Sequence, residues 1–175
     1  IGRRLKHRLL KEEGVSLRLF TKKKQAITSG AQVEIALGHT FDKESLNVAL
    51  KGIDTAYYLI HSMESENYRE LDRLSAHNFL EACINNGVKR IIYLGGLGEK
   101  ASASEHLLSR IETGEILSSR PQDIQTLWFR AGVIIGSGSA SFEIIRNLVE
   151  KLPFMITPKW VETLCQPSSE KDVIE

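Results

Sequence analysis

The chain has 175 residues, of which 42% are hydrophobic and 26% charged, with 23 Lys and Arg against 22 Asp and Glu. This composition excludes collagenous and disordered classes, and no apolar run approaches the roughly 18 residues of a membrane span. A chain of this length buries roughly two-thirds of its unfolded surface, so its core needs neither disulfides nor metal. We therefore expect one globular domain over residues 1–175, with no membrane segment.

The two cysteines carry no metal or disulfide signature. Cys83 and Cys165 form no Cys-x-x-Cys pair and have no matching set of His residues. Both are expected to be reduced thiols, which favours a cytoplasmic location, and no metal site is predicted.

Basic residues are concentrated at the start of the chain. Residues 1–30 hold nine Lys and Arg against Glu12 and Glu13, a net charge of +7. Such a segment could attract nucleic acid or phosphorylated ligands. No nucleic-acid-binding motif accompanies the charges, so a solvated helix face followed by a Lys-rich loop is the simpler interpretation and no nucleic-acid partner is expected.

Hydrophobic periodicity predicts helices and strands that alternate along the chain. Asp42 is a good N-cap residue, and a later helical stripe includes Leu71, Leu74, Ser75 and Phe79. In chain order the expected elements are a helix at 2–13, strands at 15–20 and 33–37, a helix at 43–51, a strand at 55–60, a helix at 71–85, a strand at 90–94, a helix at 104–118, a strand at 126–130 with an extension at 133–135, a helix at 142–152, a short strand at 154–157 and a short helix at 172–175.

This alternation predicts an α/β fold with a doubly wound parallel sheet and helices on both faces. In such sheets, ligands bind beyond the carboxyl ends of the strands. The segments that follow the predicted strands are 21–24, 38–42, 61–63, 95–98 and 131–141.

Two stretches in the middle of the chain carry a family resemblance. The sequences of residues 76–83 and 86–96 resemble the central segment of atypical short-chain dehydrogenases, and 104–110, 129–136 and 153–167 are similar to the NAD(P)H-binding, NmrA-like branch of that superfamily. The resemblance covers nearly the whole chain. It implies a Rossmann-like domain that binds NAD(P).

The first residues look like the end of the family's glycine motif, with Gly2 as its third glycine. The resemblance then implies that the first strand and the first two glycines are absent, which leaves a gap in the sheet between the strands at 15–20 and 55–60. Residues after about 153 would begin a truncated substrate-side region. We expect Gly2 to lie at a helix N-terminus that receives the pyrophosphate.

The end of the strand at 15–20 bears on cofactor choice. Thr21 and Lys22 are followed by two more lysines, and no carboxylate competes for a ribose hydroxyl. Basic residues there accept a 2′-phosphate, so NADP is favoured over NAD, although an ordinary solvated Lys run is the alternative. His39 stands where the family usually has an acidic residue near the adenine.

The resemblance also implies a Tyr with a Lys four residues later and a Ser pair, and the chain departs from all three. His106 takes the Tyr position, Arg110 the Lys position, and Gly95-Gly96 the Ser positions. His106 could act as an acid or base, or be an exposed His without function. Arg110 cannot shuttle protons, although it can bind ribose hydroxyls or phosphate.

Two further segments lie at predicted strand ends. His61 and Ser62 follow the strand at 55–60, where the family meets the cofactor, and residues 136–141 read as a substrate-side loop. The expected catalytic residues are His106 and Arg110, and the expected cofactor-binding residues are Gly2, Thr21, Lys22, His39, His61, Ser62, Gly95, Gly96 and Arg110.

Three functions remain open from the sequence. The first is an oxidoreductase that transfers hydride between NAD(P) and an unidentified small substrate. The second is an NADP(H)-sensing regulatory or assembly protein without turnover, which the lack of a Tyr-Lys pair favours. The third is a nucleotide-sugar epimerase-like enzyme, which would need the same Tyr. The sequence indicates no oligomeric state.

Overall fold

The computed structural model describes residues 1–22, 32–62, 67–136, 140–151 and 164–175. Its elements are α1 (Gly2–Leu9), β1 (Leu17–Thr21), β2 (Val33–Leu37), α2 (Lys43–Leu50), β3 (Thr55–Tyr58), α3 (Tyr68–Asn85), β4 (Arg90–Gly96), the 3₁₀ helix η1 (Lys100–Ser102), α4 (Glu105–Leu117), β5 (Gln125–Ala131), β6 (Ile134–Ile135), α5 (Ala140–Lys151), β7 (Ser168–Ser169) and α6 (Glu170–Ile174). The predicted alternation is confirmed.

The first helix is shorter than the predicted 2–13. After Leu9 the amides of Lys11 and Glu12 bond to carbonyls three residues back, so the last turn tightens into 3₁₀ geometry. Gly14 then reverses the chain at a φ of 76°. The predicted strand at 154–157 lies outside the described residues.

All the described strand pairs are parallel, and they form separate sheets. β1 pairs with β2, and β4 lies between β3 and β5 in a second sheet. β6 and β7 form a third pair, of which only β6 falls in a predicted strand. Among the described strands, β1 and β3 share no hydrogen-bonded edge, so the strands predicted at 15–20 and 55–60 belong to separate sheets.

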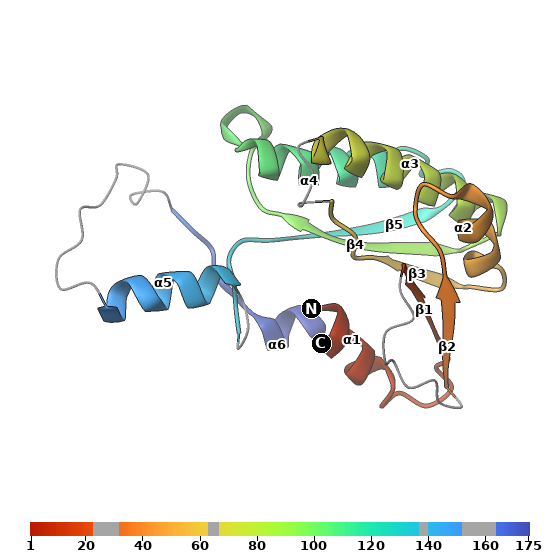
Figure 1. Cartoon of the computed structure of the whole chain (residues 1–175), viewed down its shortest axis with the longest axis horizontal. Helices are drawn as coiled ribbons and strands as arrows, with labels where there is room; N and C mark the ends of the chain where they lie inside the picture. Colours follow the sequence, from red (N-terminus) through yellow and green to blue (C-terminus); the bar gives the residue numbers. More distant parts are fainter. Residues whose placement is uncertain (23–31, 63–66, 137–139, 152–163) are drawn as a thin grey trace.

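The core lies between the β3–β5 sheet and two long helices. α3 and α4 run along one side of this sheet, and α1 and α6 lie on its other side (Figure 1). Side chains alternate along the strands, so Tyr58, Ile91 and Tyr93 point into the core and are essentially inaccessible to solvent. Each apolar side chain of this size buried from water contributes about 1.5–3 kcal/mol. The Tyr58 hydroxyl donates to Ser75 Oγ at 2.9 Å, so this buried polar group is satisfied.

α2 and α4 begin within one residue of their predicted starts, whereas α3, α5 and α6 begin two or three residues earlier than predicted. Asp42 accepts hydrogen bonds from two first-turn amides of α2, as its N-cap position requires. Ser104 caps α4 through the amide of Leu107. Arg69 on α3 binds Glu112 through two donors and Glu105 through a third, which ties α3 to α4.

Within the described ranges, no helix combines the length and apolar character that crossing a bilayer requires.

Candidate functional site

The predicted site residues gather at the carboxyl ends of the two main sheets. We call Thr21, Lys22 and His39 the β1–β2 edge, because they follow those strands. His61, Ser62, Gly95, Gly96 and Arg110 form the β3–β4 edge, where α4 supplies Arg110. Parallel strands place their carboxyl ends at one rim of a sheet, which is why residues far apart in sequence meet at each edge.

Arg110 and His61 are in direct contact at the β3–β4 edge. Nη2 of Arg110 lies 3.0 Å from Nε2 of His61. A guanidinium can only donate, so the unprotonated Nε2 accepts and the neutral ring carries its proton on Nδ1. Two main effects lower the pKa of His61 to about 4: the loss of water around its ring, which is the larger effect, and the nearby positive charge of Arg110. Part of the residue is still exposed to solvent. His61 is therefore neutral at neutral pH.

A buried carboxylate that the sequence reasoning missed supports this contact. Asp72 Oδ1 accepts from the amide of Ser62 at 2.8 Å, and Oδ2 accepts from Ser109 Oγ at 2.9 Å. The predicted stripe on α3 is wrong at one position, because Leu74 is 48% exposed while Asp72 is 5% exposed. Asp72 can be buried because hydrogen bonds satisfy its carboxylate. A prediction from hydrophobic periodicity places such a charged residue on the solvent-exposed face of the helix.

Gly95 and Gly96 line the same edge, at the positions where the resemblance implies serines. A Cβ on Gly95 would lie 2.5 Å from Nε1 of Trp128, and one on Gly96 would lie 2.5 Å from Cδ1 of Leu107 and 3.8 Å from Cδ of Arg110. The stem of Arg110 thus passes close to Gly96. Neither position has room for a serine side chain without movement of a neighbour.

His106 lies near the contact between His61 and Arg110. It is half-buried on α4, its ring centroid is 6.0 Å from that of Tyr68, and it precedes Arg110 by one helical turn. Its charge is among the smaller influences that lower the pKa of His61. The structure therefore brings both predicted catalytic residues to the β3–β4 edge.

The β1–β2 edge is basic. The amide of Gly38 donates to the carbonyl of Thr21 at 3.0 Å, which holds the two strand ends together. Partial burial and then the nearby charge of Lys22 lower the pKa of His39. Lys22 and His39 thus lie near each other at this edge. The two lysines that follow Lys22 lie outside the described residues.

Gly2 opens α1 at the carboxyl end of β3. A Cβ on Gly2 would lie 3.3 Å from Cδ1 of Leu59, so the first turn of α1 sits close to this strand end. The amides of a helix N-terminus favour anions. The pyrophosphate role that the resemblance implies for Gly2 stays a prediction.

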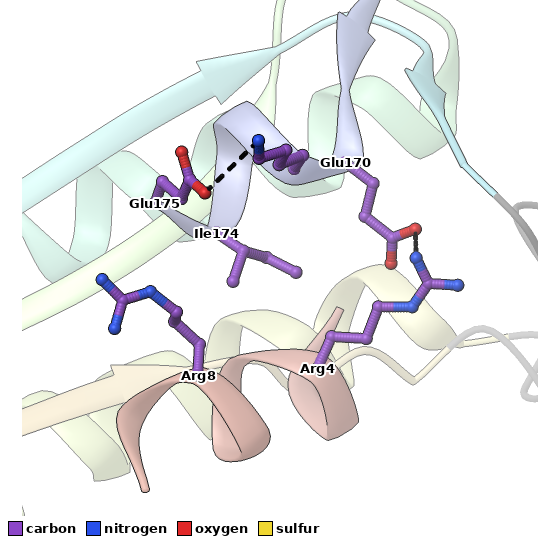
Figure 2. Close-up of a pocket in the computed structure, with 6 residues that line it drawn as sticks. Arg4, Arg8, Glu170, Ile174 and Glu175 are labelled. Carbon is purple, nitrogen blue, oxygen red and sulfur yellow. Dashed lines mark hydrogen bonds and ion pairs between the residues drawn. The ribbon is translucent and has the colours of Figure 1, made fainter. Parts of the chain in front are cut away.

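A pocket of about 280 Å³ lies between α1 and α6, and its lining residues belong to neither edge. Figure 2 shows Arg4 paired with Glu170. Lys171 forms an ion pair with Glu175 across the last turn of α6. Because carboxylates already neutralise these cations, the pocket does not resemble an anion site.

Neither cysteine adds chemistry to the site. Cys83 is buried in α3, and burial raises the pKa of its thiol to about 12. Cys165 is exposed. Within the described ranges, no group of three or more His, Cys, Asp or Glu side chains is placed to hold a metal ion.

A protein family described as NAD(P)H-binding matches residues 1–119. The chain belongs to this NAD(P)H-binding family. The short-chain-dehydrogenase-like resemblance and NAD(P) as the cofactor class are thereby confirmed, whereas the narrower NmrA-like assignment stays a prediction. No curated protein matches the chain by sequence.

Solved structures share the fold. Pen from Bacillus thuringiensis has a TM-score of 0.76 at 12% identity over 99% of this chain and 59% of its own. A dTDP-glucose 4,6-dehydratase from Streptomyces venezuelae with NAD bound gives 0.73 at 12% identity over 99% and 66%. The Citrobacter sp. triphenylmethane reductase complexed with NADP(H) gives 0.67 at 21% identity over 85% and 51%. The chain thus spans less than two thirds of each, and the Rossmann-like prediction is confirmed.

The residues at the two edges fit an NAD(P) cofactor. Lys22 and the N-terminus of α1 offer positive potential to phosphates, and Arg110 offers fixed donors to oxygen atoms. At Gly96 the side chains of Leu107 and Arg110 pass close to the backbone, because no Cβ is in their way. These cations, amides and imidazoles are groups with which the phosphates and hydroxyls of a nucleotide can form hydrogen bonds.

Proposed function

We propose that the chain is the nucleotide-binding part of an NADP(H)-dependent oxidoreductase that acts on a small, oxygen-bearing substrate. The contact between Arg110 and His61 beside Gly96 is the observation that carries this proposal. It puts a permanent positive charge and a neutral imidazole at the strand end where the family meets the nicotinamide. The absence of paired cysteines favours a cytoplasmic enzyme.

Arg110 is the group best suited to the substrate oxygen. Its guanidinium stays charged, so it stabilises negative charge that develops on a carbonyl oxygen by charge-assisted hydrogen bonds. Bound NADPH would supply the hydride. Arg110 cannot provide the proton, and neutral His61 already accepts a hydrogen bond on Nε2. His106, one turn before Arg110, remains the candidate proton donor.

The preference for NADP over NAD rests on the β1–β2 edge. Lys22 and His39 are neighbours there, and both can donate to a 2′-phosphate. No acidic side chain follows β1 among the described residues to bind the ribose hydroxyls of NAD.

A sensor without turnover is the second candidate, and a specific observation favours it. Trp128 and Leu107 fill the space that serine side chains would need at Gly95 and Gly96. Each Tyr in the chain also lacks a Lys four residues later. A site of this kind can bind NADP(H) and lack the usual carbonyl-reducing groups. Epimerase chemistry would need the same Tyr, and we do not propose it.

Calorimetric titration with NADPH and NADH, followed by a panel of small carbonyl compounds, tests the proposal. We expect NADPH to bind about five- to tenfold more tightly than NADH, and substrate-dependent loss of the reduced nicotinamide absorbance. His106→Gln should lower the rate and leave NADPH affinity unchanged. Tight NADPH binding without oxidation across the panel would select the sensor, and no binding of either nucleotide would defeat both candidates.

A further inference from the structure

Asp72 has two hydrogen bonds whose donors flank the two residues in contact at the β3–β4 edge. Its Oδ1 accepts from the amide of Ser62, next to His61, and its Oδ2 accepts from Ser109 Oγ, next to Arg110. Asp72 is 5% exposed and Ser109 is 2% exposed. One carboxylate therefore fixes both chain segments that carry the site.

The rest of the packing around this pair leaves the His61 segment dependent on Asp72. The Tyr93 hydroxyl donates to the carbonyl of Arg110 at 3.0 Å, so β4 anchors the backbone of α4 at this residue. On the side of His61, the chain has left β3 at Tyr58, and the amide of Ser62 bonds to Asp72. Loss of Asp72 would release this segment more than it would release α4.

We propose that Asp72 is a positioning residue that holds the imidazole of His61 against the guanidinium of Arg110. Its carboxylate accepts from the partly buried amide of Ser62 and from the buried hydroxyl of Ser109, and both donors lose this partner if the side chain is removed. This role serves the substrate side of the site only if the proposed function holds, but the contact itself can be measured without any cofactor.

The chemistry of asparagine gives a sharp comparison. In Asp72→Asn the amide oxygen can still accept from the Ser62 amide, and the amide nitrogen can donate to Ser109 Oγ. That variant keeps the geometry and loses the charge. Asp72→Ala loses both. Ser75→Ala is the matched control, because Ser75 is buried on the same helix and bonds to Tyr58 rather than to the site.

The readout is the titration of His61 by NMR, assigned with His61→Gln. The groups that act on its ring are Arg110 and His106 on α4, which lower the pKa, and Asp72 on α3, which raises it, in addition to the larger effect of lost hydration. If Asp72→Ala lets the His61 ring move into water, the ring regains its hydration and the effects of Arg110 and His106 on its pKa become smaller. The pKa of His61 should then rise by at least about one unit toward 6.5.

Loss of the Asp72 charge alone would lower the pKa of His61, which is opposite to the rise expected when the ring moves into water. Asp72→Asn and Asp72→Ala both remove the carboxylate that raises the pKa of His61, so a purely electrostatic role would lower that pKa in both variants. Positioning predicts a rise in the alanine variant and no rise in the asparagine variant. Ser75→Ala should leave the titration unchanged. The proposal is overturned if alanine and asparagine shift the pKa alike, or if Ser75→Ala raises it as much as Asp72→Ala.

A second variant covers the case in which Asp72→Ala does not fold. Ser109→Ala keeps the carboxylate charge and removes one of its two donors. It should give a smaller rise of the same sign, and no rise would also overturn the proposal. Calorimetry with NADPH is run in parallel. Failure of the wild-type chain to bind NADPH would defeat the proposed function and leave the titration result standing.

Discussion

Nη2 of Arg110 and Nε2 of His61 lie 3.0 Å apart, which joins helix α4 to the segment that follows β3. The two residues are 49 positions apart in the sequence, so their contact is a product of the parallel sheet. It combines a cation with a ring that stays neutral. The pair can therefore donate hydrogen bonds to oxygen atoms without exchanging a proton at neutral pH.

Replacement of Arg110 tests the charge directly. In Arg110→Met the nearest cation is removed from His61, so the pKa of His61 should rise from about 4 while the burial of its ring still keeps it below 6.5. NADPH affinity should fall about tenfold or more, the value expected for one charged hydrogen bond. NMR titration and calorimetry measure these effects. Arg120→Gln removes a cation paired with Asp123 instead and serves as the control; equal losses in both variants would contradict a local role.

His61 should make stability depend on pH. Its pKa is about 4 in the folded chain and ordinarily 6.5, so between these values the unfolded chain binds more protons. The free energy of unfolding should therefore fall as pH falls from about 6.5 to about 4, and this contribution should be constant above that range. His61→Gln should flatten the slope in urea unfolding. Some slope should persist, because the pKa of His39 is lowered as well.

His77→Gln is the control for this measurement, because His77 is an exposed residue on α3. It should keep the wild-type slope. If His61→Gln kept the full slope too, the ring would not be held in its neutral form by the fold.

Serine substitution tests the crowding at the glycine pair. Gly95→Ser should destabilise the chain by about 1–3 kcal/mol, because the indole of Trp128 occupies the space. Gly96→Ser should cost less, since the end of the Leu107 side chain can rotate away. Urea unfolding gives both values. In a Trp128→Phe background Gly95→Ser should cost less than in the wild type; an equal cost would show that Trp128 is not the obstacle.

Cofactor preference should reverse at the β1–β2 edge. Lys22→Glu places a carboxylate where a 2′-phosphate would bind, so NADPH affinity should fall about tenfold or more while NADH affinity is kept or improved. Calorimetry with the two nucleotides gives the ratio. Lys51→Glu makes the same charge change at an exposed position after α2 and should leave the ratio unchanged. A uniform loss for both nucleotides in the Lys22 variant would point to a general electrostatic effect.

Much of the fold could be predicted because its signals are local. Asp42 marks a helix start, and the apolar run from Thr55 marks a buried parallel strand. Element ends were less predictable. The tightening of α1 after Leu9 depends on 3₁₀ hydrogen bonds, and β7 is two residues long and exists only because it pairs with β6.

The sequence predicts residues that line the candidate site, but it does not predict the buried residues that hold them in place. Strand ends identified His61 and Gly95, and the family resemblance added Arg110. Asp72 was missed, because one Asp in a helix reads as a solvated residue unless its partners at Ser62 and Ser109 are known. The role of Trp128 was also not predictable, because its indole packs against Gly95 on β4 and Gly114 on α4 and so joins β5 to elements distant in sequence.

The separation between the β1–β2 pair and the β3–β5 sheet gives this NAD(P)H-binding chain a mechanical property. α2 packs against both β2 and α3, and thus bridges the two sheets, which share no ladder of backbone hydrogen bonds within the described residues. A dinucleotide that contacts both the β1–β2 edge and the β3–β4 edge would link the two sheets and restrict their relative motion. Amide exchange in β1 and β3 should then slow together on binding, and part of the intrinsic affinity would be spent on stiffening the protein.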